Sequence, residues 1–314
     1  MRLRGKERIM STVTLKTFLR PRLWYAWPAL ALLLLASWLP LRVLWIMGTG
    51  LGTFISWFPT FSKRHAIRNI ELCFPGKTPA ERKRLLKQHF RMAGFATLSN
   101  SMAWFAPLWR LRKAVKLQGG NGFEDVRASG RTIILLAPHF IALDIGGMRA
   151  GYDKNLVCMY RKARDPLLEY LYQRRTRTGA VLVDRLANMR TLLRHIKDGR
   201  PFYYLPDMDM GERASVFVPF FGIPAATVTA LSRIAASTNA AVVPCISRIL
   251  PHGQGFEVRL LPPLENFPTD DPVADAARMN REIEKWVLEA PEQYMWSYRR
   301  FKTRPNDEPS LYED

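Results

Sequence analysis

The sequence predicts an α/β domain with a mainly parallel sheet flanked by helices, and three observations support this. Short apolar runs recur through the second two thirds of the chain, segments of helical length separate them, and charged residues follow several of them. Buried parallel strands are near-continuous apolar runs, and helices connect them. The expected strands are residues 132–137, 156–160, 180–183, 202–205, 241–246 and 256–261.

Local signals mark two of the expected helices. Thr78 is a typical N-cap residue, Pro79 fits the first helical position, and Glu81 completes a capping box before a run of apolar residues. Residues 185–198 carry apolar side chains at helical spacing and end at Gly199, a residue that commonly terminates helices. Both segments are therefore expected to be helical.

The amino-terminal region predicts a membrane anchor. A basic arm, residues 1–22, precedes residues 23–41, which carry no charge and are long enough to cross a bilayer core of roughly 20 residues. A cleaved signal peptide is the competing interpretation, but no small-residue cleavage site follows. Residues 43–62 form a weaker apolar stretch that is either interfacial or re-entrant. We expect a membrane anchor and interfacial helix over residues 23–62 and the α/β domain over residues 63–314.

Charge and cysteine content limit the function classes. The 314-residue chain has a formal net charge of +20, which implies an anionic partner: nucleic acid, acidic lipid or an acidic carrier protein. The three cysteines, Cys73, Cys158 and Cys245, are odd in number and lie in apolar contexts. They fit neither a disulfide framework nor a zinc site, and they suggest a reducing compartment.

One histidine follows an expected strand directly. His139 lies two residues after the first expected strand, residues 132–137, and Asp144 lies five residues further on. A neutral imidazole at the end of a sheet, with a carboxylate to fix its tautomer, is the arrangement that deprotonates a hydroxyl. If a helix begins just after His139, Asp144 can fold back toward the ring. The competing interpretation is a helix-capping histidine beside an unrelated, solvated aspartate.

Two more charged loops are expected at the same edge of the sheet, where α/β proteins bind ligands. Arg161 and Arg164 follow the second expected strand, and Asp207 and Asp209 follow the fourth. For the two arginines, anion binding and ordinary surface charge are equally favoured. The Asp-x-Asp spacing of Asp207 and Asp209 also resembles that of metal-dependent transferases, whose Mg²⁺ sites use one or two carboxylates.

Four blocks of sequence indicate a family. They are residues 69–75 (NIELCFP), the pair His139 and Asp144, residues 215–222 (SVFVPFFG) and residues 291–305 (PEQYMWSYRRFKTRP). With these blocks in this order, the chain resembles the lipid A biosynthesis late acyltransferases, the lauroyl and myristoyl transferases of Gram-negative inner membranes. The similarity extends over nearly the whole chain.

This resemblance implies a glycerol-phosphate-acyltransferase-like fold and transfer of a fatty acyl chain from acyl carrier protein to a hydroxyl of a Kdo-bearing lipid A precursor. His139 would be the general base and Asp144 its support, without an acyl-enzyme or a cofactor. The residues around Asp207 and Asp209 match this family, and acyl transfer to an alcohol needs no metal, so the resemblance implies no metal site. The family further implies substrate-binding roles for an arginine and an aspartate, which match Arg175 and Asp207; Arg174 and Arg177 are close enough to be alternatives. The enzyme would contact lipids of the bacterial inner membrane, with its catalytic domain on the cytoplasmic face.

Two alternatives remain at this point. The same chemistry could act on another lipid acceptor, such as an ornithine lipid. A basic, membrane-bound protein that binds nucleic acid would also explain the charge, but it would not require His139, and the anchor argues against it. We therefore expect no nucleic-acid partner.

Overall fold

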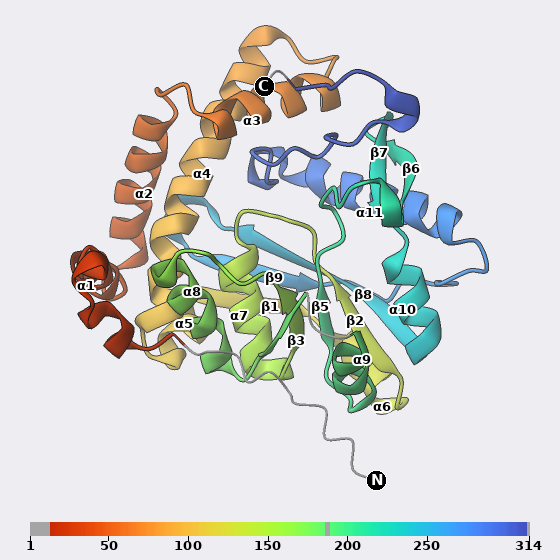
Figure 1. Ribbon diagram of the computed structural model, residues 1–314, viewed down its shortest axis with the longest axis horizontal. Helices are drawn as coiled ribbons and strands as arrows, with labels where there is room; N and C mark the ends of the chain where they lie inside the picture. Colours follow the sequence, from red (N-terminus) through yellow and green to blue (C-terminus); the bar gives the residue numbers. More distant parts are fainter. Residues whose placement is uncertain (1–12, 186–188, 313–314) are drawn as a thin grey trace.

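The computed structural model describes residues 13–185 and 189–312, and within these residues a twisted sheet crosses the molecule with helices on both faces (Figure 1). Its seven described strands lie in the order β1-β9-β8-β2-β5-β3-β4. Neighbouring strands are parallel except for the antiparallel pair β8 and β9. The predicted mainly parallel α/β fold is thus confirmed. The strands are β1 (Val115–Gly119), β2 (Thr132–Leu136), β3 (Val157–Tyr160), β4 (Val181–Asp184), β5 (Phe202–Tyr204), β8 (Ala240–Ile249) and β9 (Phe256–Leu260).

All six expected strands are present, but three further strands were not predicted. Strand β1 lies at the sheet edge and exposes polar side chains, so it lacks the apolar run of a central strand. Strands β6 (Ser215–Phe220) and β7 (Ile223–Val228) form a separate antiparallel hairpin. Its two-residue turn, Phe221 and Gly222, has positive φ at both positions, which suits the twist of a hairpin.

Alternation along the central strands divides the core into two layers. In β2, Ile134 and Leu136 belong to one buried cluster, and Ile133 and Leu135 belong to the cluster on the opposite face. Helices α9, α10 and α11 contribute to the first layer, and α6 and α7 contribute to the second. The described helices are α1 (Ala26–Ala36), α2 (Leu41–Ile55), α3 (Phe61–Cys73), α4 (Pro79–Phe105), α5 (Leu108–Ala114), α6 (Asn121–Ala128), α7 (Leu143–Lys154), α8 (Pro166–Gln173), α9 (Met189–Lys197), α10 (Ala230–Thr238) and α11 (Pro272–Glu289). The 3-10 turns are η1 (Leu15–Leu19), η2 (Pro21–Leu23), η3 (Arg174–Thr178), η4 (Glu212–Ala214), η5 (Pro251–Gly253), η6 (Pro291–Gln293) and η7 (Pro305–Asp307).

Both locally predicted helices are confirmed where the structure describes them. Helix α4 begins after Thr78, which exchanges hydrogen bonds with Glu81 in the expected capping box. The second, α9, is described from Met189 onward, because residues 186–188 lie outside the described residues. Helix α4 runs 27 residues along one side of the molecule and supports the amino-terminal helices (Figure 1).

Glycines allow α2 to cross α4 at backbone contact distance. A Cβ atom on Gly52 would lie 2.0 Å from the carbonyl oxygen of Phe90, and one on Gly94 would lie 2.2 Å from the carbonyl oxygen of Gly48. No larger residue fits at such a crossing without moving a backbone. One face of α2 is therefore fixed to the domain, while the opposite face exposes Ile46 and other apolar side chains.

The single long anchor expected over residues 23–41 does not form. Helix α1 ends at Ala36, and α2 begins at Leu41, directly after Pro40. Proline disfavours the helical conformation in the residue before it, and this explains the break. Across residues 13–185 and 189–312, no helix combines the length and the apolarity that crossing a bilayer requires. Residues 1–12 of the expected basic arm lie outside the described residues.

Candidate active site

Two neighbouring parallel strands deliver a histidine and an aspartate to the same edge of the sheet. Leu136 at the end of β2 is paired with Tyr204 at the end of β5. Each strand then continues through one residue and a proline, so that His139 and Asp207 both lie three positions beyond the paired residues. Because the strands are parallel and in register, equal offsets place the two side chains next to each other.

Asp207 holds His139 through both the ring and the backbone. Nδ1 of His139 lies 2.6 Å from Oδ1 of Asp207, and the backbone N–H of His139 donates to Oδ2 at 2.8 Å. The hydroxyl of Tyr294 also donates to Oδ2, at 3.0 Å. An ionised carboxylate can only accept, so Nδ1 carries the ring proton and Nε2 keeps its lone pair. This is the tautomer that a general base requires at Nε2.

The surroundings of Asp207 favour its ionised form. Its side chain is completely buried, and burial alone would raise the pKa of the carboxyl; the interactions with His139, together with the positive charge of Arg300, outweigh burial and lower that pKa below its ordinary value. The neighbouring hydroxyls remain protonated, because burial, followed by the charge of Asp207, raises the pKa of Tyr204 and Tyr294. Asp207 therefore faces donors and acts as a fixed negative charge.

The expectation that Asp144 holds the imidazole is wrong in its geometry, since Asp207 occupies Nδ1. Residues 140–142 form a turn, and the helix begins only at Leu143, so Asp144 lies in the first turn of α7 instead of more than one turn inside. Its Oδ1 lies 2.6 Å from a terminal guanidinium nitrogen of Arg175. Asp144 thus belongs to a second ion pair, which also lines the cavity beside His139.

Of the three candidate arginines after α8, only Arg175 lines the cavity. Arg174 donates to the carbonyl of Trp104, and Arg177 donates to the carbonyls of Ala103 and Ala106. These are the last carbonyls of α4, which have no partner within the helix, so Arg174 and Arg177 cap that helix. The guanidinium of Arg175 stacks 4.3 Å from the ring of Tyr172; burial lowers its pKa, but the Asp144 carboxylate outweighs burial and raises it.

A cavity of about 700 Å³ opens at His139. This is within the range of roughly 300–1,000 Å³ that small-molecule pockets occupy. Most of its lining is apolar, and methionines from several elements contribute, which allows the wall to adapt to a flexible ligand. The apolar lining includes Leu143, Met148, Leu156, Met159, Met189, Phe202, Leu205, Pro206, Met208, Met210, Ile234 and Met295.

The other expected site residues take different places. Arg161 lines the cavity, whereas Arg164 is exposed outside it. Asp209 turns away, because its carboxylate accepts hydrogen bonds from the backbone and hydroxyl of Thr303. Within the described residues no cluster of three or more His, Cys, Asp or Glu side chains could hold a metal ion. Cys158 also lines the cavity, but burial raises the pKa of its thiol to about 11, so it remains a neutral thiol at physiological pH.

Sequence reasoning missed Tyr294, Arg185 and Arg233 as residues of this region. Arg185 follows β4 as Arg161 follows β3, and its backbone N–H donates to the carbonyl of Tyr160. Arg185 and Arg233 both line the cavity. The equal strand-x-Pro offsets of His139 and Asp207 were a usable signal for the pair, but Tyr294 comes from the carboxyl-terminal segment, and no strand pattern predicts its position.

Comparisons with known proteins place the chain among bacterial relatives. A family model described as "Bacterial lipid A biosynthesis acyltransferase" matches residues 12–303. The lipid A biosynthesis lauroyltransferase of Escherichia coli (strain K12) is 36% identical over 296 residues, covering 94% of this chain and 96% of the relative. The lipid A biosynthesis palmitoleoyltransferase of the same strain is 34% identical over 301 residues, covering 95% and 97%. A crystal structure of the 1-acyl-sn-glycerophosphate (LPA) acyltransferase PlsC from Thermotoga maritima matches 77% of this chain and 96% of its own, with a TM-score of 0.36 and 14% identity.

Proposed function

The chain belongs to the bacterial lipid A biosynthesis acyltransferase family and is an acyltransferase, and on that premise we propose that it moves a fatty acyl chain from acyl carrier protein to a hydroxyl of a Kdo-bearing lipid A precursor. The observation that carries this proposal is the His139–Asp207 pair at the opening of a largely apolar cavity. A base that is held in one tautomer beside space for a hydrocarbon chain suits acyl transfer to an alcohol.

The reaction follows from the two ring nitrogens of His139. Nε2 takes the proton of the acceptor hydroxyl as its oxygen attacks the thioester carbonyl of the donor. The new C–O bond forms the ester, the C–S bond breaks, and the proton passes from Nε2 to the departing thiolate of the carrier. Asp207 holds Nδ1–H and balances the imidazolium in between. The acceptor itself is the nucleophile, which is consistent with a neutral Cys158 thiol.

The second ion pair has a different role in this proposal. Arg175 offers a planar set of donors at the cavity wall, and Asp144 and the Tyr172 ring fix its orientation. Such a group suits the oxygen of the thioester carbonyl, which gains negative charge during attack. Asp144 would therefore act by positioning Arg175 and not by holding His139.

Arginines around the cavity support an anionic substrate. Arg161, Arg185 and Arg233 line it, and none has a carboxylate partner that the structure of residues 13–185 and 189–312 records. Arg161 and Arg185 directly follow the residues Tyr160 and Asp184, which are paired at the ends of β3 and β4, so the two arginines start from neighbouring positions at the cavity wall. A phosphate or carboxylate of the substrate would pair with these arginines, and Arg164 would extend the positive field outside the cavity.

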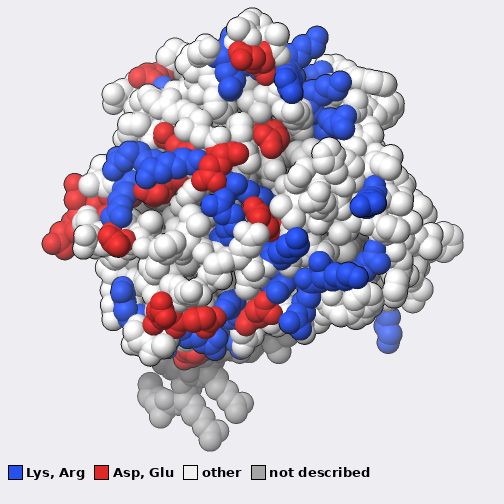
Figure 2. Space-filling model, turned by 180° about the vertical axis from the view of Figure 1, so that it is seen from behind, with Lys and Arg blue, Asp and Glu red and all other residues white. Residues whose placement is uncertain are grey.

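An exposed apolar surface on α1, α2 and the turn after α2 supports contact with a membrane. Leu32, Ile46 and Trp57 expose 67–70% of their surface, and further apolar side chains lie between them. Seen from behind in Figure 2, the outermost part of this side of the molecule is largely uncharged, and lysines and arginines lie above and below it. We infer that this surface enters the interface of an anionic leaflet, the inner membrane in the proposed pathway, while basic residues contact headgroups.

Vesicle co-sedimentation tests the membrane surface. The double variant Ile46→Ser, Trp57→Ser should bind vesicles of anionic phospholipid at least tenfold more weakly, because each large side chain contributes about 1.5–3 kcal/mol when it leaves water. Leu288→Ser is the matched control, since Leu288 is also exposed, at 59%, but lies on α11. Equal binding by the double variant and the control would refute the assignment of this surface.

Mass spectrometry of reaction products tests the substrates. Purified protein would be incubated with carrier proteins that bear acyl chains of different lengths, and with Kdo-bearing precursor, precursor without Kdo, or an ornithine lipid. We expect one acyl chain to be added to the Kdo-bearing precursor, with one chain length preferred. Acylation of the aminolipid alone would overturn the proposed acceptor, and transfer only from a donor other than acyl carrier protein would overturn the proposed donor.

A further inference from the structure

The carboxyl-terminal segment reaches the active site at Tyr294. Its hydroxyl donates to Oδ2 of Asp207, the carboxylate whose other oxygen faces Nδ1 of His139. The three side chains form a continuous line, from a phenol through a carboxylate to an imidazole. We propose that Tyr294 is a positioning residue of the reaction, which sets the orientation and the basicity of Asp207 and, through it, of His139. This inference rests on the proposed role of His139 as the general base.

The segment around Tyr294 is fixed to the histidine loop through its backbone. The N–H of Met295 donates to the carbonyl of His139 at 2.9 Å, and the N–H of Ile141 donates to the carbonyl of Gln293 at 2.8 Å. Phe140 and Tyr294 face each other across this isolated bridge. The segment therefore contacts the histidine loop on both sides of Tyr294, and these contacts position the phenol relative to the imidazole.

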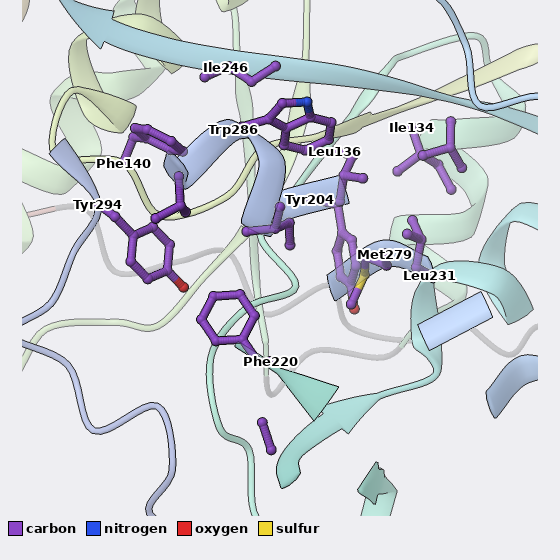
Figure 3. Close-up of a cluster of buried hydrophobic side chains, with 14 of the residues drawn as sticks. Ile134, Leu136, Phe140, Tyr204, Phe220, Leu231, Ile246, Met279, Trp286 and Tyr294 are labelled. Atoms are coloured by element: carbon purple, nitrogen blue, oxygen red, sulfur yellow. The ribbon is translucent and has the colours of Figure 1, made fainter. Parts of the chain in front are cut away.

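The ring of Tyr294 is also held in one orientation. It makes edge or tilted contacts with Phe140, Phe220 and Trp296, at centroid distances of 6.0, 5.9 and 4.9 Å. Figure 3 shows the ring within this buried cluster, near Phe140 and Phe220. Tyr294 is 4% exposed, so no solvent molecule replaces its hydroxyl readily. Packing of this kind turns a hydroxyl into a donor at a fixed point.

Asp207 needs such a donor because it must accept from several directions at once. Oδ1 faces the imidazole, and Oδ2 accepts from the backbone of His139 and from Tyr294. The positive charge of Arg300 also acts on this carboxylate, whereas burial raises the pKa of Tyr204 and Tyr298, so their hydroxyls stay protonated and carry no charge. Without the phenol, Oδ2 loses one of its two donors, so the carboxylate becomes more basic and freer to turn.

Tyr294→Phe removes the hydroxyl and keeps the ring. We expect kcat to fall roughly tenfold to a hundredfold, the factor for one hydrogen bond to a charged group, with KM within about twofold of wild type. The acidic limb of the kcat/KM profile should move up by as much as about one pH unit, because a more basic Asp207 favours the imidazolium. Tyr298→Phe is the matched control: its hydroxyl donates to the backbone carbonyl of Asp209, and its loss should leave the limb in place.

A double-mutant cycle separates positioning from general packing. In an Asp207→Asn background, Tyr294→Phe should change kcat by less than about twofold, because its effect passes through the carboxylate. The inference would be overturned if Tyr294→Phe lowered kcat as much in the Asp207→Asn background as in the wild type. It would also be overturned if the single variant left the acidic limb of the kcat/KM profile unchanged. If Tyr294→Phe does not fold, 3-fluorotyrosine can be placed at position 294 instead. Its hydroxyl is a stronger donor, so the acidic limb of the kcat/KM profile should move to lower pH. An unchanged acidic limb would likewise overturn the inference. Activity in His139→Ala would instead overturn the proposed function itself.

Discussion

Exchanging the carboxylate that holds the imidazole for an amide should nearly abolish turnover. In Asp207→Asn the side chain gains an NH2 group that must face one of three donors: Nδ1–H and the backbone N–H of His139, and the hydroxyl of Tyr294. If Nδ1 becomes an acceptor, the proton moves to Nε2 and the base is lost. A wrong tautomer of this kind costs about 10⁴ in kcat in hydrolase triads, and we expect a loss of roughly 10³–10⁴ here. The NH2 group of the asparagine would face another buried donor, and this mismatch should lower the free energy of unfolding by about 1–3 kcal/mol.

The assay is single-turnover acyl transfer at several pH values, with thermal unfolding to confirm that the variant is folded. Asp144→Asn is the matched control, because it removes a carboxylate charge from the cavity beside His139 but leaves Nδ1 of His139 with Asp207. We expect Asp144→Asn to be less damaging and to act through Arg175. If Asp207→Asn keeps more than about a tenth of wild-type turnover, or if Asp144→Asn is the more damaging of the two, the reasoning fails.

Three further predictions concern the second ion pair, the helix crossing and a buried histidine. Arg175→Lys should lower kcat at both low and high salt, because lysine keeps the charge but loses the planar fork and the stacking on Tyr172; full activity at both salts would remove Arg175 from the site. Gly94→Ala should lower the free energy of unfolding, measured by chemical denaturation, by about 1–3 kcal/mol, because its Cβ would lie 2.2 Å from a backbone oxygen. Gly50→Ala is the control and should be neutral or stabilising, because a Cβ there has nothing within 4 Å. The reverse order of the two stabilities would contradict the close helix crossing. Burial lowers the pKa of His89 to about 4, so the unfolded chain binds a proton at higher pH than the folded protein does. The free energy of unfolding should therefore fall by up to about 1.4 kcal/mol per pH unit as the pH drops from 6.5 toward 4. His89→Gln should remove this contribution to the pH dependence of stability.

The fold was predictable from sequence wherever burial on both faces left a continuous apolar run. Strands β2, β3, β4, β5 and β8 have this pattern, and each lies where it was expected. Strand β9 alternates apolar and charged residues, and it also lies where it was expected. Edge strand β1 and the hairpin β6–β7 do not have it, because they pack on one face only or outside the main sheet. The single anchor helix was predicted from the number of consecutive apolar residues, which takes no account of Pro40. In the structure this stretch is divided into α1, which ends at Ala36, and α2, which begins at Leu41.

The sequence was sufficient to identify most residues of the site, but not to say which of them contact each other. His139 and Asp207 were recognisable at strand ends, yet their contact depends on the sheet order, which places β2 beside β5 although two strands come between them along the chain. The nearest carboxylate in sequence, Asp144, was assigned to the histidine because spacing along the chain was the available measure. Tyr294 joins the site from the other end of the domain, through a single bridge that leaves no periodic signal.

The central claim is that Nε2 of His139 removes the proton of the acceptor hydroxyl. The most direct test is the rate of product formation by purified His139→Ala, with acyl carrier protein bearing the preferred chain and Kdo-bearing precursor at saturating concentrations. His195→Ala, on α9, is the control for loss of an imidazole elsewhere. We predict a loss of about 10²–10⁴ in folded His139→Ala, and wild-type turnover in the control. Turnover in folded His139→Ala above about a tenth of wild type would contradict the account.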